Sequence, residues 1–307
     1  MTDIYQNVTN KIVAALDQGV IPWIKPWSPA RGSTYHPFPI NAITGRPYRG
    51  VNIPLLWAEA QLQGFSQDRW LTFNQARSAG GHIRKGEHST LAVLYKTLER
   101  ETKDEHGNPI LDEAGNPEMA QVAWLKANFL FNIEQTEGLE GLHETEAEDS
   151  PPTDEFDPNL YAEQLLQRSG ARIVHRPTDQ AFYNPSQDLI QLPERKQFAS
   201  ESGYYATALH ELTHWTGHAS RLKRHQTFAP SSFGVDAYAF EELVAEMGAA
   251  FLCARAGIQG ELRHEGYINS WLKALKSDKK FLFLAGGFAR EASEYLINLA
   301  EDPPLAT

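Results

Sequence analysis

Residues 208–222 read "ALHELTHWTGHASRL" and hold three of the chain's 11 histidines within nine positions. His210 and His214 are four residues apart, so on a helix they project from the same face, one turn apart. Two imidazoles in this arrangement supply half of a tetrahedral zinc site, and Glu211 can act as general base toward a water molecule at the metal. The stretch therefore predicts a zinc site on a helix.

The flanking residues favour such a helix over a chance match to the H-E-x-x-H pattern. Residues 202–215, "SGYYATALHELTHW", contain no proline and carry small and aromatic residues at the spacing of a buried helix. Ser200 or Ser202 can cap its start, and Gly217 is expected to end it.

A catalytic zinc takes three protein ligands, so a third must come from elsewhere. The long metzincin pattern would place a histidine six residues after His214, where this chain has Ser220. The sequence therefore does not fit a metzincin. His218, two positions earlier, is one alternative for the third ligand or for a neighbour of the site.

A second alternative lies in residues 240–257, "FEELVAEMGAAFLCARAG", which predict a helix that is apolar nearly all round. Glu242 and Glu246 would then be buried acids one turn apart, which is costly unless a cation lies between them. With zinc present, Glu242 binds the metal and Glu246 accepts a hydrogen bond from a ligand imidazole. Otherwise Glu241 and Glu242 stabilise the helix start, and Glu246 pairs with an arginine.

The composition suits a globular protein of two domains, with 307 residues of which 41% are hydrophobic. No apolar run approaches the roughly 18 residues of a membrane span. Residues 3–18 predict an amphipathic helix and not a signal peptide. We therefore expect a cytoplasmic protein without a membrane partner, in which the single Cys253 is a core residue and forms no disulfide within the chain.

The net charge of −11 is concentrated in one segment. Residues 134–157 carry ten acidic side chains and no lysine or arginine, and the rest of the chain is nearly neutral. This segment also contains Pro151 and Pro152, and it predicts a solvated linker. The first 98 residues hold ten lysines and arginines against five acids, which predicts a basic N-terminal domain.

Aromatic and basic residues alternate in the N-terminal half, with nine aromatic residues between Trp23 and Phe73. Residues 21–57 are rich in proline and glycine and predict an irregular segment. Exposed rings beside cations are typical of proteins that bind single-stranded nucleic acid, although in a small domain such rings are more often core, as expected for Trp57 and Trp70.

The remaining patterns predict an α+β fold. Residues 89–96 and 123–133 read as strands, and the "HGNP" and "AGNP" turns between them indicate a hairpin arm. In the second half, a helix over 159–167 and strands over 171–175, 181–184 and 188–193 precede the H-E-x-x-H helix. Two amphipathic helices follow the acidic helix, with Trp271 and Phe283 as packing residues. A small sheet beside a metal-bearing helix is an α+β arrangement.

Several blocks along almost the whole chain resemble the ArdC-type antirestriction proteins of conjugative plasmids. They include "RPYRGVN" at 46–52, "WLTFNQA" at 70–76, "RKGE" at 84–87, "FNIEQTEGL" at 131–139, "YYATALHELTHWTGH" at 204–218 and "EELVAE" at 241–246. The resemblance implies an N-terminal domain that binds single-stranded DNA (1–133), an acidic linker (134–157) and a C-terminal zincin-like metallopeptidase domain (158–307). Its implied role is to protect incoming DNA from host restriction.

Residue by residue, the resemblance implies Zn²⁺ on His210, His214 and Glu242, with Glu211 as the base and Glu246 beside the ligands. His218 is a further candidate beside the ligands from its spacing alone. Tyr238 and His218 are the candidates for stabilising an oxyanion. The implied DNA contacts are Trp23, Lys25, Trp27, Arg46, Tyr48, Arg49, Arg84 and Lys85. The peptidase substrate would be a host protein related to restriction, and no oligomeric state is predicted.

Two other functions stay open at this point. In one, the protein is an interaction module with a structural or dormant zinc site, and its acidic linker imitates DNA. In the other, a peptidase or toxin domain merely carries an N-terminal adaptor.

Overall fold

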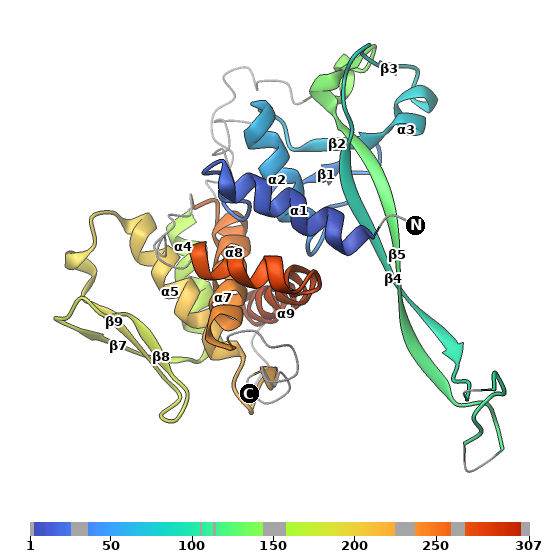
Figure 1. Cartoon of the computed structure of the whole chain (residues 1–307). Coiled ribbons are helices and arrows are strands. Elements are labelled where there is room, and N and C mark those ends of the chain that lie inside the picture. Colours follow the sequence, from blue (N-terminus) through green and yellow to red (C-terminus); the bar gives the residue numbers. More distant parts are fainter. Residues whose placement is uncertain are drawn as a thin grey trace.

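The structure is a computed structural model, and it describes residues 3–25, 36–104, 106–112, 115–143, 158–224, 237–258 and 268–301 (Figure 1). An N-terminal part is built on a four-stranded sheet, and a C-terminal part consists of helices beside a three-stranded sheet. The predicted α+β class with two parts is confirmed. None of the helices in these ranges is both long and apolar enough to span a membrane.

The N-terminal sheet has the order β1-β2-β5-β4, with β1 parallel to β2 and the other neighbours antiparallel. Strands β3 and β6 form a separate antiparallel pair. The elements are α1 (Ile4–Asp17), β1 (Ile40–Asn41), α2 (Asn52–Gln63), β2 (Arg69–Thr72), α3 (Phe73–Ser78), β3 (His82–Ile83), β4 (Thr90–Glu101), β5 (Met119–Asn132) and β6 (Thr136–Glu137).

Helix α2 corrects the expectation of an irregular segment up to residue 57. It begins at Asn52. Pro54 lies in its first turn, where backbone N–H groups have no partner within the helix, so the missing N–H of proline costs nothing there. Gly64 ends the helix in the left-handed region with φ of 72°.

Trp57 and Trp70 are fully buried, as predicted, and share one acceptor. Trp57 Nε1 donates to Asp68 Oδ2 at 2.9 Å, and Trp70 Nε1 donates to Asp68 Oδ1 at 3.1 Å. One buried carboxylate therefore satisfies the indoles of both α2 and β2.

Strands β4 and β5 form the predicted arm, which extends well beyond the body of the protein (Figure 1). Their register runs from Thr90 opposite Leu130 to Glu101 opposite Met119. At the tip, two turns with the same backbone bond follow each other, Gly107 N to Asp104 O and Gly115 N to Asp112 O, both 3.0 Å.

These two turns are joined at their base by a closed ring of backbone hydrogen bonds. Thr102 N donates to Glu118 O at 2.8 Å, Glu118 N to Ile110 O at 2.7 Å, and Ile110 N to Thr102 O at 2.8 Å. Thr102, Ile110 and Glu118 therefore form a common base from which both turns project.

The C-terminal sheet has the order β7-β9-β8, with β7 parallel and β8 antiparallel to β9. It lies beside the helices on the side away from the arm (Figure 1). The elements are α4 (Pro158–Ser169), β7 (Arg172–Arg176), β8 (Phe182–Asn184), β9 (Leu189–Pro193), α5 (Glu201–Thr216), α7 (Ala237–Ala256), α8 (Ile268–Ser277) and α9 (Phe281–Glu301).

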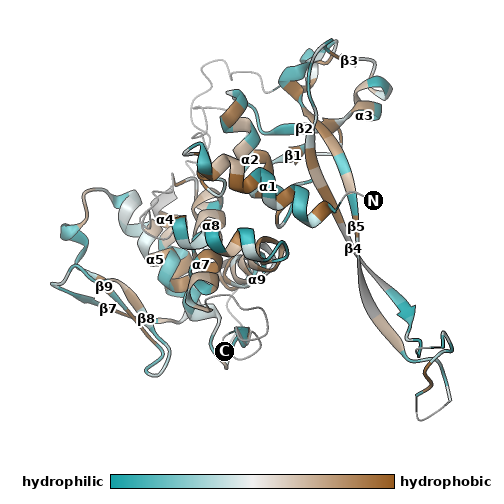
Figure 2. Cartoon of the chain, viewed as in Figure 1, coloured by the Kyte–Doolittle hydropathy of each residue, from teal (hydrophilic) through white to brown (hydrophobic). Residues whose placement is uncertain are grey.

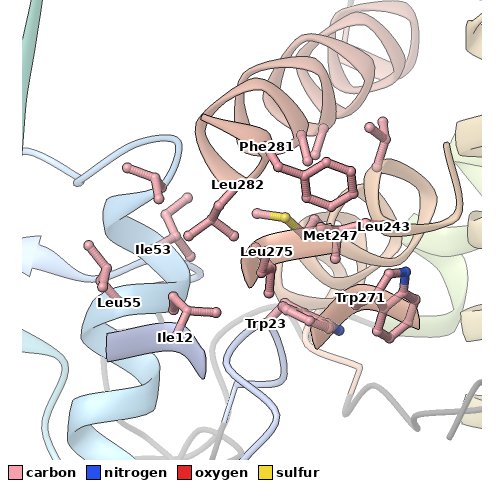
Figure 3. Packing of buried hydrophobic residues seen from close by; sticks show 14 of the residues in the cluster. Ile12, Trp23, Ile53, Leu55, Leu243, Met247, Trp271, Leu275, Phe281 and Leu282 are labelled. Carbon is pink, nitrogen blue, oxygen red and sulfur yellow. The ribbon is translucent and has the colours of Figure 1, made fainter. Parts of the chain in front are cut away.

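The largest hydrophobic core joins the two parts. Figure 2 shows hydrophobic stretches on α2, α7 and α9, and Figure 3 shows side chains of α1 and α2 next to those of α7, α8 and α9. Among the residues of this cluster are Ile12, Trp23, Ile53, Leu55, Leu243, Met247, Trp271, Leu275, Phe281 and Leu282. The N-terminal helices α1 and α2 therefore share one core with α7, α8 and α9.

The acidic segment starts within the folded N-terminal part. Glu134 Oε1 accepts hydrogen bonds from the backbone N–H groups of Ser66 and Gln67 at 2.6 and 2.7 Å. Leu139 is buried in a core cluster with Leu71. The prediction of a linker is thus wrong for residues 134–143, and residues 144–157 lie outside the described ranges.

Candidate metal centre

Helix α5 presents His210 and His214 to the same side. Ser200 caps the helix, because its hydroxyl accepts a hydrogen bond from Gly203 N at 3.0 Å, and Gly217 follows the last helical residue, as expected. The Nε2 atoms of the two histidines are 3.2 Å apart. Both rings therefore direct Nε2 toward a common point.

Helix α7 brings Glu242 to that point. Its carboxylate oxygens lie 3.5 Å from Nε2 of His210 and 3.5 Å from Nε2 of His214, and the donor atoms of the three residues lie within 4.8 Å of one another. Tetrahedral metal bonds of about 2.0–2.1 Å place ligand atoms about 3.3 Å apart. The three side chains fit a metal ion without rearrangement.

The two helices approach closely where α7 has a glycine. A Cβ atom on Gly248 would lie 2.5 Å from Cγ2 of Thr213, which is well inside contact distance. Glycine at this position lets α7 pack against α5 closely enough for Glu242 to reach both histidines.

A second carboxylate contacts the other ring nitrogen of His214. Glu241 Oε1 lies 3.1 Å from His214 Nδ1. The same carboxylate accepts hydrogen bonds from Arg224 Nε at 2.8 Å and Arg224 Nη2 at 2.6 Å. The sequence placed Glu241 only at the helix start, and no pattern singled out Arg224.

Glu246 lies next to the ligand His210, and its carboxylate faces the ring nitrogen Nδ1. Its Oε1 lies 3.8 Å from His210 Nδ1, outside hydrogen-bond distance. Of the two acids, Glu241 is therefore the one that touches a ligand imidazole directly.

Negative charge exceeds positive charge in this buried region. The relative exposures of Glu211, Glu242 and Glu246 are only 6%, 6% and 8%, and Arg224 is already paired with Glu241. Buried carboxylates are costly unless they are paired or coordinate a metal. A divalent cation between the histidines and Glu242 matches this donor set and its charge.

The same carboxylates control the ionisation of the histidine. Burial lowers the pKa of His214, but contacts with Glu241 and Glu242 outweigh this effect and raise the pKa to about 10. Burial raises the pKa of Glu242, but His210 and His214 outweigh it and hold the pKa well below its usual range. The carboxylates thus favour positive charge at the point where His214 and Glu242 meet, which suits a bound cation, and Glu242 stays ionised.

A cavity of about 470 Å³ opens beside the metal position. Glu211 lines it, and the Glu211 carboxylate makes no hydrogen bond with any residue in the described ranges. Trp23, from the N-terminal part, forms another portion of the wall. Cys253 also lines the cavity, and burial, followed by the nearby Glu246 charge, raises the pKa of its thiol to about 12.

His218 does not join the three ligands. Its Nδ1 lies 2.8 Å from Ser220 Oγ, and the metal-site group among described residues consists of His210, His214 and Glu242 alone. Tyr238 is 57% exposed and is not among the residues that line the cavity. The structure brings neither oxyanion candidate to the cavity wall.

The residues implied for DNA contact have different surroundings. Trp23 is fully buried in the shared core, so the prediction that its ring stacks on a base is wrong. Lys25 is half-buried, and its Nζ donates to His36 O at 2.6 Å. Trp27 lies outside the described residues. Tyr48 is half-buried, and burial raises its pKa.

The four other basic candidates are on the surface. Arg46, Arg49, Arg84 and Lys85 are exposed, and Arg84 donates to Glu87 at 2.7 and 3.0 Å. Sequence reasoning did not single out the exposed rings Phe73, Trp124 and Phe129, which are 47%, 39% and 59% exposed. For Trp124 and Phe129, both in β5, strand alternation alone cannot distinguish an exposed ring from a core residue.

Two family models match the chain in succession. Residues 2–131 match the N-terminal domain of the anti-restriction factor ArdC, and residues 161–287 match a zincin-like metallopeptidase. The second match spans both helices that carry the histidines and Glu242. By its fold and site, the C-terminal part is a zincin-like metallopeptidase domain with a His-His-Glu metal site.

Solved structures resemble the whole chain. The metal-free crystal structure of the antirestriction ArdC protein from plasmid R388 has a TM-score of 0.76 and 36% identity, covering 97% of this chain and 98% of that one. Its Mn(II)-bound form has a TM-score of 0.74 and 35% identity, with coverages of 98% and 99%. The chain belongs to the ArdC family of antirestriction proteins.

Curated relatives include longer proteins. A DNA primase TraC of Escherichia coli is 40% identical over 301 residues, which are 95% of this chain and 20% of the primase. A second TraC is 38% identical and is covered to 27% of its length, so this chain spans only a small part of these primases. The protein y4eC of Sinorhizobium fredii (strain NBRC 101917 / NGR234) is 34% identical, with coverages of 96% and 92%.

Proposed function

We propose that this protein protects incoming plasmid DNA from restriction in the cytoplasm of the new host, by binding single-stranded DNA and by cleaving a host protein related to restriction. The observation that carries the catalytic part is the convergence of His210, His214 and Glu242 beside a cavity lined by Glu211. Zinc is the proposed metal, because two histidines and one glutamate form a common ligand set of catalytic zinc.

The proposed reaction is hydrolysis of a peptide bond in that cavity. When bound, a divalent ion supplies a Lewis acid that polarises a carbonyl group and lowers the pKa of water. Glu211 Oε takes a proton from the attacking water and later delivers it to the leaving amine. Its burial beside the cavity, without a competing hydrogen bond from the described residues, supports this role.

Glu211→Gln tests the catalytic part. We expect the variant to bind as much zinc as the wild type, measured by mass spectrometry, and to lose protection of a plasmid transferred into a restricting host. General acid–base catalysis contributes about 100-fold or more, so residual hydrolysis should not sustain protection. Glu201→Gln, on an exposed residue of the same helix, is the matched control. Full protection by Glu211→Gln would show that peptide hydrolysis is not the working activity.

Support for DNA binding comes from the match of residues 2–131 to the ArdC N-terminal domain and from the exposed Arg46 and Arg49. Exposed Phe73 and Phe129 offer rings for stacking. Arg46, Arg49 and Phe73 lie within the first 98 residues, which carry the basic excess.

The Arg46→Gln/Arg49→Gln double variant tests this surface by fluorescence anisotropy on a labelled oligonucleotide. Each lost phosphate contact should reduce the slope of log affinity against log salt by about 0.7, hence by about 1.4 for both. Arg172→Gln/Arg176→Gln, on exposed residues of β7, is the matched control. An unchanged slope would place the DNA elsewhere.

An alternative function is DNA mimicry by the acidic segment, because residues 144–157 carry seven acids and no lysine or arginine. Deleting this range leaves the folded residues 134–143 in place. Protection lost with DNA affinity and zinc content retained would favour mimicry. Protection retained would exclude it.

A further inference from the structure

Arg224 is a buried arginine next to the metal centre, with a relative exposure of 2%. A buried guanidinium is costly unless its charge is paired and its donors are satisfied. Arg224 Nη1 donates to Thr216 Oγ1 at 3.1 Å, and Nη2 to Thr213 O at 3.0 Å. Within the described part of the chain, its other hydrogen bonds are the two to Glu241. The side chain is thus held in one place by four bonds.

Glu241 links this arginine to a metal ligand. Glu241 Oε1 accepts from Arg224 Nη2 at 2.6 Å and also lies 3.1 Å from His214 Nδ1. A carboxylate at Nδ1 keeps the proton on that nitrogen, which leaves the lone pair of Nε2 for the metal. The three residues form a chain from Arg224 through Glu241 to His214.

His214 has more need of such support than His210. Helix α5 ends at Thr216, only two residues after His214, and the last turn of a helix leaves carbonyl groups without partners inside the helix. Arg224 binds one of the carbonyls of this last turn, that of Thr213, which also accepts from Thr216 Oγ1 at 2.6 Å, and the same guanidinium holds Glu241 on α7. It therefore ties the end of α5 to the start of α7 at the level of His214.

We propose that Arg224 is a positioning residue of the metal centre, which holds the Glu241 carboxylate on Nδ1 of His214 and so keeps Nε2 aimed at the metal. This role rests on the metal site of the proposed function. Arg224 thus affects metal affinity through Glu241, without contacting the metal itself.

Zn²⁺ affinity of the full-length chain tests the proposal, measured by competition with a chromophoric chelator. Arg224→Gln and Glu241→Gln should each raise the Kd by about 10-fold to 100-fold, the range found when hydrogen-bond partners of metal ligands are removed. Because both act on the same nitrogen of His214, the double variant should raise the Kd no further than Glu241→Gln alone.

Arg221→Gln is the matched control. Arg221 lies three residues earlier with an 8% exposed side chain. It binds Trp215 O at 2.7 Å and Asp188 at 2.5 and 2.9 Å, and these partners are not metal ligands. Its loss should lower the unfolding temperature of the metal-free chain and leave the Kd unchanged.

Three results would overturn the positioning role. They are an unchanged Kd in Arg224→Gln, additive losses in the double variant, and an equal loss in Arg221→Gln. If Arg224→Gln does not fold, the Kd of Glu241→Gln tests the proposal instead. An unchanged Kd in that variant would show that the Glu241 carboxylate does not support His214 as a metal ligand. A wild-type chain that binds no Zn²⁺ would instead overturn the metal site itself.

Discussion

Asp68 shows how much can depend on one residue. Replacing it with alanine leaves the indole N–H groups of Trp57 and Trp70 buried without this acceptor. Each such donor costs about 1–3 kcal/mol, so Asp68→Ala should lower the free energy of unfolding by about 3 kcal/mol. Urea denaturation measures the change, and Asp17→Ala, on an exposed aspartate of α1, should stay within about 0.5 kcal/mol. Equal effects of the two variants would contradict the shared-acceptor role.

The contact between Asp188 and Arg221 predicts a pH dependence. A hydrogen bond from Arg221 holds the pKa of Asp188 below its ordinary value. This contact therefore stabilises the fold fully above the unfolded-state pKa of about 3.9, and the effect disappears as pH falls through the lower pKa of the folded state. Asp188→Asn should lower the unfolding temperature by about 1–2 °C at pH 7, a small effect because the carboxylate is partly exposed. Near pH 2 the substitution should leave the unfolding temperature unchanged. A difference that persists at pH 2 would contradict the assignment.

The metal ligands were predictable one by one because each has a local signal. The i, i+4 histidines on one helix face favour a metal ion, and the buried acids of an apolar helix favour a cation or another positive partner. Arg224 has no such signal, because one basic residue among Arg221, Lys223 and Arg224 looks like any other in a polar stretch. Only its burial distinguishes it.

The close packing of α5 against α7 depends on Gly248, which has no side chain. Gly248→Ala would push Cβ into Thr213 Cγ2, so the helices must separate and the distance from Glu242 to the histidines must grow. We expect a loss of about 1–3 kcal/mol in stability and a weaker Kd for Zn²⁺, partly restored by Thr213→Ser, which removes the methyl group. Gly287→Ala on α9 meets no neighbour within 4 Å and is the control. A Kd unchanged in Gly248→Ala would contradict this account.

Most helices and strands follow from periodicity, but α2 does not. Proline ordinarily argues against a helix, and only its position in the first turn makes Pro54 compatible with one. Whether Pro54 falls in the first turn depends on where the helix begins. The sequence before residue 52 contains many turn residues and no N-cap residue that would mark this start. Val51, at the N-cap, makes no side-chain hydrogen bond.

The whole molecule should unfold as one unit, because the largest core contains α1 and α2 together with α7, α8 and α9. Ile12→Ala removes a fully buried side chain of α1 and should cost about 2–5 kcal/mol. It should also reduce hydrogen-exchange protection in α7 and α9. Ile133→Ala, in a cluster confined to the N-terminal part, should also reduce protection in α9, because a single cooperative unit loses protection throughout when any part of its core is weakened. Two separate calorimetric transitions, with only the first shifted by Ile12→Ala, would contradict a shared core.

The amphipathic face of α1 was visible in the sequence, but its partner was not. Periodicity reports that Val8, Ile12 and Leu16 are buried, and it is silent on what covers them. The charge contrast between the two halves favours independent domains joined by a linker, and the core shows why that inference goes too far. Apolar contacts across the two parts carry no charge signal.

The ring of backbone bonds at the arm tip makes the arm modular in length. If residues 103–110 were absent, Thr102 O would lose Ile110 N and Glu118 N would lose Ile110 O. Thr102 and Glu118 could then bond each other in both directions, continuing the register beyond the pair Glu101 and Met119. Eight-residue units can therefore be gained or lost during evolution without disturbing the strands below, so relatives can vary the reach of this arm while keeping its base unchanged.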